Sequence, residues 1–122
     1  MSFMERKYTL CTNLSAIPIT NFEDYLIARN GKLYYLDPES EICTDISHIV
    51  FKFTKKGIPV YRIIDKKKNS LEIRLDKLVL NSFIGDMDSL IMHKNYELSD
   101  CSLENLQYIF IPQNINNDII LC

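Results

Sequence analysis

The first clear pattern along the chain is a pair of apolar runs joined by a tight turn. Residues 25–28 and 32–36 are rich in Leu, Ile and Tyr, and they flank Asn30 and Gly31. Asn-Gly between two apolar runs is a strong signal for a β-hairpin, because both residues readily adopt the positive φ angles of a tight turn. The sequence therefore predicts a first hairpin here.

Two further β-branched and aromatic runs follow, at residues 49–53 and 60–64. They are separated by residues 55–59, Lys-Lys-Gly-Ile-Pro, which predicts a second hairpin with a basic loop. A third turn is expected at residues 66–69, before a short apolar run at residues 71–73. Strands are therefore expected to dominate up to this point.

The spacing of the apolar positions then changes to that of a helix. One helical stripe is occupied by Leu75, Leu78, Val79, Ser82 and Phe83. This spacing predicts an amphipathic helix that Gly85 would end. Residues 100–106 offer Asp or Ser as the N-cap of a short helix, and residues 108–111 are typical of a strand stopped by Pro112. A further apolar stretch lies at residues 119–121.

Length and composition restrict the class of protein. The 122 residues, 47% hydrophobic and 25% charged, match one ordinary globular domain. Only 3 Gly and 4 Pro are present, fewer than an all-β protein with many tight turns usually needs. No run approaches the roughly eighteen apolar residues of a membrane span, and no secretory signal precedes the first hairpin. We expect an α+β protein that does not enter a membrane and stays in the compartment where it is made.

The net charge of -2 hides an uneven distribution. Residues 52–77 contain nine basic and three acidic residues, so this segment carries +6 and the rest of the chain -8. One interpretation is a phosphate-facing strip that binds DNA or RNA. The alternative is a solvated hairpin whose lysines only aid solubility. The candidate nucleic-acid-binding residues are Lys52, Lys55, Lys56, Arg62, Lys66, Lys67 and Lys68.

Three segments resemble, in order, the motifs of phage and homing HNH endonucleases. Residues 21–34, NFEDYLIARNGKLY, resemble the opening of the module that precedes many of these enzymes. Residues 76–84, DKLVLNSFI, are similar to their H-R-L-V-A-x-A-F-I helix. Residues 92–108, MHKNYELSDCSLENLQY, track N-H-I-D-G-N-K-T-D-N-R-P-E-N-L-E-W without a gap. The resemblance spans about residues 21–114.

This resemblance implies a domain organisation. It predicts a single domain over residues 1–122, with an N-terminal β-hairpin module at about residues 21–74. An HNH-like ββα-metal core is expected to follow at about residues 75–117. The expected fold class is therefore α+β.

The resemblance also implies the residues of the site. His93 matches the general base that deprotonates the attacking water, and Asn105 matches the central Asn, which has a structural role. Asn114 falls where a ligand of the single divalent ion would lie. Met92 stands at the other ligand position, and its thioether is a poor partner for Mg²⁺, which prefers oxygen. Asp76 replaces the His of the helix motif and is a candidate substitute ligand.

Each of these residues also has a structural alternative. His93 could be an ordinary packed histidine, and Asn105 could simply bond backbone groups. Aspartates on a helix face, such as Asp76, are mostly solvated. Tyr96 occupies the place where the family often has a Gly, the residue best suited to a tight turn.

The departures from the motif favour a catalytically impaired HNH-like protein of a virus or phage, retained for nucleic-acid binding or as part of an assembly. Two alternatives remain: an active metal-dependent DNA endonuclease, and a viral structural or inhibitory protein acting only through protein contacts. No tightly bound cofactor is expected, and Mg²⁺ is implied only if cleavage survives. The abundance of Asn, Ile, Lys and Tyr is typical of AT-rich viral genomes, which places the protein in the host cytoplasm or in the virion.

Overall fold

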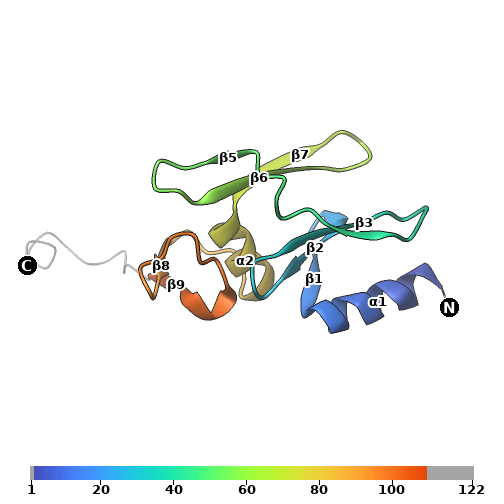
Figure 1. The fold of residues 1–122 in the computed structure, drawn as a ribbon, viewed down its shortest axis with the longest axis horizontal. Coiled ribbons are helices and arrows are strands. Elements are labelled where there is room, and N and C mark those ends of the chain that lie inside the picture. The colour runs from blue at the N-terminus through green and yellow to red at the C-terminus, as the bar shows by residue number, and fades with distance from the viewer. Residues whose placement is uncertain (1, 110–122) are drawn as a thin grey trace, which may run out of the picture.

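The computed structural model describes residues 2–109, which form an α+β fold (Figure 1). The elements are α1 (Phe3–Leu14), β1 (Ala16–Ile19), β2 (Phe22–Ala28), β3 (Leu33–Leu36), β4 (Cys43–Asp45), β5 (Lys52–Phe53), β6 (Pro59–Ile64), β7 (Ser70–Arg74), α2 (Leu75–Phe83), β8 (Leu90–His93), the 3₁₀ turn η1 (Leu103–Asn105) and β9 (Leu106–Ile109). The described strands form three antiparallel sheets in the orders β1-β2-β3-β4, β5-β6-β7 and β8-β9. The α+β expectation is confirmed.

The first predicted hairpin is confirmed as β2 and β3, with Tyr25 opposite Tyr35. Gly31 lies in its turn at a φ of 88°, a value that side chains other than glycine rarely adopt. A Cβ atom on Gly31 would lie 3.2 Å from the carbonyl oxygen of Cys101. Gly31 is therefore needed for the turn and also for the close approach of the segment that precedes β9.

The second hairpin and the third turn are also confirmed, with one change in strand length. The hairpin is formed by β5 and β6, and the third turn joins β6 to β7. Regular pairing begins only at Lys52, not at residue 49, because Val50 turns inward to pack against the core. The apolar run thus extends beyond the strand.

The predicted helix is confirmed as α2, and it ends where Gly85 follows. The backbone N–H groups of Ile84 and Gly85 both donate to the carbonyl oxygen of Leu80. The short helix expected near residue 103 is only the single 3₁₀ turn η1, and the strand after it begins at Leu106, two residues earlier than predicted. The continuation of this strand beyond residue 109 and the apolar stretch at 119–121 lie outside the described residues.

Helix α1 was not predicted, although its start carries a recognisable signal. The side chain of Ser2 accepts a hydrogen bond from the Glu5 backbone N–H, and the Glu5 carboxylate accepts one from the Ser2 backbone N–H. This reciprocal pair is a capping box, written in the sequence as S-x-x-E. Apolar periodicity did not reveal the helix because the only residue it buries is Lys7, whose ammonium group donates to the carbonyl oxygen of Glu23.

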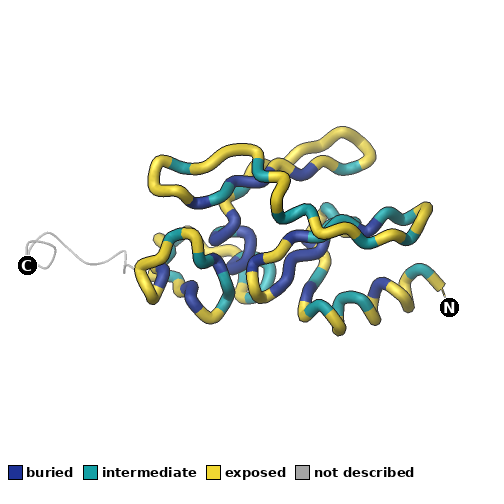
Figure 2. Tube along the Cα trace, viewed as in Figure 1, coloured by how far each residue is buried: buried dark blue, intermediate teal, exposed yellow. Residues whose placement is uncertain are grey.

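The main core is centred on α2, which contacts all three sheets (Figures 1 and 2). Leu78 and Val79 of this helix pack in one cluster with Ile27 of the first sheet, Ile63 of the second and Leu106 of the third. The first turn of α2 therefore lies where the sheets meet. No helix in residues 2–109 is long and apolar enough to cross a membrane.

Candidate functional site

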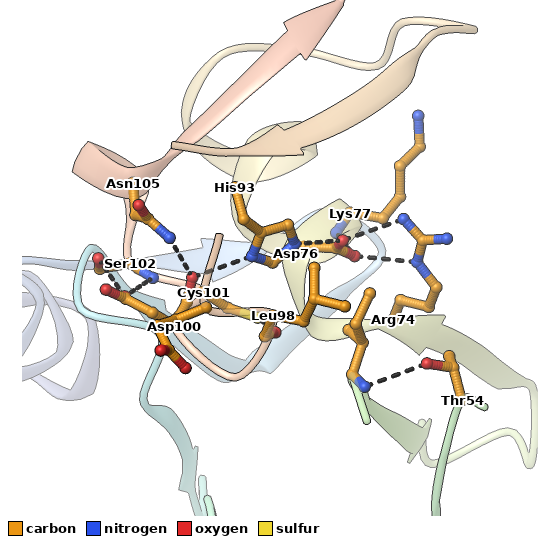
Figure 3. Close-up of polar contacts among 12 residues, drawn as sticks. Thr54, Arg74, Asp76, Lys77, His93, Leu98, Asp100, Cys101, Ser102 and Asn105 are labelled. Carbon is orange, nitrogen blue, oxygen red and sulfur yellow. Dashed lines mark hydrogen bonds and ion pairs between the residues drawn. The ribbon is translucent and has the colours of Figure 1, made fainter. Parts of the chain in front are cut away.

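The packing around α2 brings together two of the residues singled out in the sequence, Asp76 and His93 (Figure 3). Asp76 lies in the first turn of α2, and His93 is the last residue of β8. The Nε2 atom of His93 is 3.0 Å from Oδ2 of Asp76, and the two side chains are only 2% and 1% exposed. The Asp76 carboxylate is therefore buried against the histidine rather than solvated.

The same carboxylate is held by two other groups. Arg74 binds it with both arms of its guanidinium group, Nε to Oδ1 and Nη2 to Oδ2, each at 3.0 Å. The backbone N–H of Lys77 donates to Oδ1 at 2.7 Å. A carboxylate has about four acceptor positions, and these contacts together with His93 fill them.

The other ring nitrogen of His93 faces an acceptor as well. Nδ1 lies 3.2 Å from the carbonyl oxygen of Asp100. A neutral imidazole has one donor and one acceptor nitrogen, so it can donate to only one of these two oxygens. Each ring nitrogen thus faces an oxygen atom of the protein, and the side chain is only 2% exposed, which leaves little room for a water molecule at either nitrogen.

Asn105 links the turn after His93 to the loop before η1. Its Oδ1 atom accepts from the backbone N–H of Asn95 at 2.9 Å, and its Nδ2 atom donates to the carbonyl oxygen of Asp100 at 2.8 Å. Asn105 is buried, and its own carbonyl oxygen accepts from the N–H of Lys94. The Asn105 side chain therefore positions two backbone segments and has no contact with Asp76.

The turn that follows His93 forms even though Tyr96 occupies the glycine position of the motif. Tyr96 adopts a φ of 63°, in the left-handed region, and its N–H donates to the carbonyl oxygen of His93. Its side chain points into solvent, 87% exposed. A non-glycine residue in this conformation costs roughly 1–2 kcal/mol, which the surrounding hydrogen bonds offset.

Two neighbouring groups have shifted pKa values but are not catalytic candidates. Hydrogen bonds from the side chain and backbone of Ser102 hold the pKa of Asp100 below its ordinary value. Burial raises the pKa of Cys101 to about 12, and the negative charge of Asp76 adds to this. The Cys101 thiol therefore stays protonated near neutral pH and is not a nucleophile.

A cleft of about 590 Å³ lies beside the buried pair. Its walls come from the β5–β6 loop, β7, α2 and β8, with lining residues that include Lys56, Ile58, Arg74, Lys77, Leu90 and His93. Three acidic side chains, Glu72, Asp76 and Asp88, line it together with the three cationic ones, so the charges of its walls balance.

The described residues do not fit a Mg²⁺ ion at this position. The acceptor positions of Asp76 are taken by N–H donors, two of them from a positively charged guanidinium. Met92 supplies only a thioether, and Asn114, the expected ligand, lies outside the described residues. Within residues 2–109 no three His, Cys, Asp or Glu side chains converge as metal ligands.

The seven basic candidates do not form one continuous strip. Lys52, Lys55 and Lys56 lie on β5 and in the β5–β6 loop, whereas residues 66–68 lie in the β6–β7 turn at the opposite end of β6 (Figure 1). Six strand residues separate the two ends by roughly 20 Å. Residues 66–68 border a cleft of about 1050 Å³ that acidic Glu23 and Asp24 also line.

The three antiparallel sheets arranged around α2 define an HNH-endonuclease-like fold. Among solved structures, the chain is similar to the HNH homing endonuclease I-HmuI, in a structure described as DNA binding and cleavage by that enzyme. The TM-score is 0.59 at 16% sequence identity, covering 77% of this chain and 51% of that chain. The present chain thus spans about half the length of that protein. At this identity the likeness shows the fold alone, and it confirms the fold class expected from the motifs.

No protein-family profile matches the chain, and no curated protein matches it in sequence.

Proposed function

We propose that the protein is a nucleic-acid-binding member of the HNH-like fold whose histidine stabilises the structure instead of cleaving a phosphodiester. One observation carries this proposal: buried His93 faces an oxygen atom at each ring nitrogen, while Arg74 also binds the Asp76 carboxylate. A general base needs a free ring nitrogen within reach of a water molecule. Neither nitrogen of His93 is free.

The free-energy cost of breaking the contact between His93 and Asp76 supports an impaired enzyme. For His93 to accept a proton from water, its contact with Asp76 must first break. Breaking this contact leaves two buried groups without a partner, and each such group costs about 1–3 kcal/mol. If this cost were added to the activation barrier, it would slow the reaction by roughly two to four powers of ten. The contact between His93 and Asp76 is therefore unfavourable for catalysis. It is well suited to hold α2 against β8.

Nucleic-acid binding is supported by the charge of the second hairpin. Residues 46–64 contain four basic and no acidic residues, and Lys56 lines the cleft beside His93. Such a cationic surface attracts phosphates without any need for an active catalytic centre. We place the protein in an infected host cell or in a virion, where single- or double-stranded nucleic acid is available.

The first test measures binding and cleavage together. The full chain is expected to bind oligonucleotides with an affinity that falls as salt rises, and to leave plasmid DNA uncut with Mg²⁺ or Mn²⁺. Changing both Lys55 and Lys56 to Gln removes about two phosphate contacts. This should lower the slope of log affinity against log salt by about two. Electrophoretic mobility shift and nicking assays provide both measurements.

The control is the same change of charge at the other end of β6, Lys66→Gln with Lys67→Gln. An equal loss of affinity in both double variants would mean that binding depends only on the net charge of the protein. Metal-dependent cleavage that disappears in His93→Gln would instead support the active endonuclease. A protein that binds no nucleic acid at all would favour the role based on protein contacts.

The second test concerns the metal. Calorimetric titration of the full chain with Mn²⁺ is expected to show no micromolar one-to-one site, because N–H donors fill the acceptor positions of Asp76. Met92→Asp adds a carboxylate next to His93 and is expected to tighten binding, whereas Met92→Leu is not. Micromolar binding by the unmodified chain that is lost in Asn114→Ala would contradict the proposal and restore Asn114 as a ligand.

A further inference from the structure

Two exposed aromatic side chains lie at the edge strand β5, Phe51 immediately before it and Phe53 at its end. Phe51 is 48% exposed and Phe53 is 62% exposed. Large apolar side chains are normally buried, so two such rings two positions apart are informative. β5 pairs only with β6, so it is an edge strand of the three-stranded sheet (Figure 1).

Two cations lie near the ring of Phe51. The guanidinium carbon of Arg62 lies 5.5 Å from the centre of the Phe51 ring, and Nζ of Lys52 lies 5.9 Å from it. Lys52 also pairs with Glu72 at 3.2 Å. Among the described residues, no carboxylate lies within ion-pair distance of Lys55, Lys56 or Arg62. The surface therefore combines exposed π faces with unneutralised positive charge.

These two features together match one class of ligand. Single-stranded nucleic acid offers phosphates to the cations and unpaired bases to the rings, whereas a duplex hides the faces of its bases by stacking. Residues two apart on a strand are separated by about 7 Å, twice the spacing of stacked bases, which leaves room for a base against each ring. An apolar protein interface does not require cations beside its aromatic side chains.

We infer that Phe51 and Phe53 are base-stacking residues, and that Lys52, Lys55, Lys56 and Arg62 bind the backbone of the same single strand. The preferred ligand is therefore unpaired DNA or RNA rather than duplex. This inference rests on the proposed nucleic-acid binding and adds to it the form of the ligand and two residues that charge analysis alone does not identify.

The test compares single strands with duplexes. Three probes of equal length are compared: a 12-nucleotide oligo-dT, an oligo-U and a DNA duplex. A fourth probe is the same oligo-dT with a central 2-aminopurine. We expect tighter binding of the single strands and a change in 2-aminopurine fluorescence on binding. Stacking on one aromatic ring contributes roughly five- to 150-fold in affinity. The double variant Phe51→Leu with Phe53→Leu should therefore lose at least about tenfold for single strands.

The leucine variant keeps the size and charge of the surface, so its affinity for duplex and its salt slope should stay within about twofold of the original. Phe53→Tyr retains a π face and should bind as the original chain does. The matched control is Tyr8→Leu, which removes a 75% exposed aromatic on α1 and should change nothing. Thermal unfolding of each variant verifies that the fold is intact.

The outcomes separate the inference from the proposed function. If the Lys55 and Lys56 variant weakens binding while the two leucines change nothing, the stacking inference is overturned and nucleic-acid binding stands. Equal affinity for duplex and single strand in the original chain also overturns it. If no oligonucleotide binds at all, both the stacking inference and the proposed nucleic-acid binding are wrong. Preference of oligo-U over oligo-dT, or the reverse, identifies which nucleic acid supplies the unpaired bases.

Discussion

Asp76→Ala is expected to lower the free energy of unfolding by about 3–5 kcal/mol, one of the two largest effects of a single substitution in this chain. The change leaves the buried ring of His93 without its acceptor and releases the guanidinium of Arg74. Removing the carboxylate is costly because the buried ring of His93 and the N–H of Lys77 lose their acceptor. Urea unfolding with linear extrapolation provides the measurement.

The control is an exposed aspartate with a similar ion pair. Asp86 is 81% exposed and lies 3.3 Å from the ammonium group of Lys77. Exposed pairs of this kind contribute about 0–1 kcal/mol, so Asp86→Ala should have little effect. A double-mutant cycle of Asp76→Asn and His93→Gln isolates the coupling between the two side chains. A coupling energy near zero would mean that the contact between Asp76 and His93 does not stabilise the fold.

The sign of the Asp76 effect also bears on function. Catalytic groups are often held in arrangements that reduce stability, so that replacing them leaves a protein equally or more stable. A large loss of stability in Asp76→Ala, with no cleavage activity in the original chain, would support the stabilising role. A more stable Asp76→Ala variant would instead indicate an arrangement kept for catalysis.

The parts of the fold that local sequence determines could be predicted. The first hairpin follows from Asn30 and Gly31, and α2 follows from its apolar stripe and the glycine after it. Helix α1 lacks such a stripe, and only the capping box of Ser2 and Glu5 identifies it. Periodicity reports which face of an element is buried, so an element that buries mainly a lysine stem is not detected.

The site was less predictable because it depends on long-range packing. Motif order brought attention to His93 and Asp76, but nothing local indicates that they touch across 17 positions. Their contact requires α2 to lie where all three sheets meet. Arg74 matches no motif. Its position two residues before Asp76 is the one sequence signal for its bidentate contact with the Asp76 carboxylate. A sequence pattern gives residue types, whereas the oxygen atoms that face the two ring nitrogens of His93 are placed there by the fold.

Asn105→Ala is the second substitution with a large expected effect, a loss of about 2–4 kcal/mol in the free energy of unfolding. It leaves the N–H of Asn95 without its partner and removes a donor from the carbonyl oxygen of Asp100. Both hydrogen bonds are partly buried, and each lost bond of this kind costs about 1–2 kcal/mol. The same carbonyl oxygen also faces Nδ1 of His93, so the histidine loses part of its support.

Asn105→Asp separates the two hydrogen bonds of the side chain. The carboxylate has nearly the same shape and can still accept from the N–H of Asn95, but it has no donor for the carbonyl oxygen of Asp100. An acceptor then faces an acceptor in a buried site, so the loss should equal or exceed that of the alanine variant. Hydrogen exchange should show the Asn95 amide protected in Asn105→Asp and exposed in Asn105→Ala. A loss below about 1 kcal/mol in both variants would mean that water replaces the side chain at these contacts, and Asn105 would then no longer be the residue that joins the His93 turn to η1.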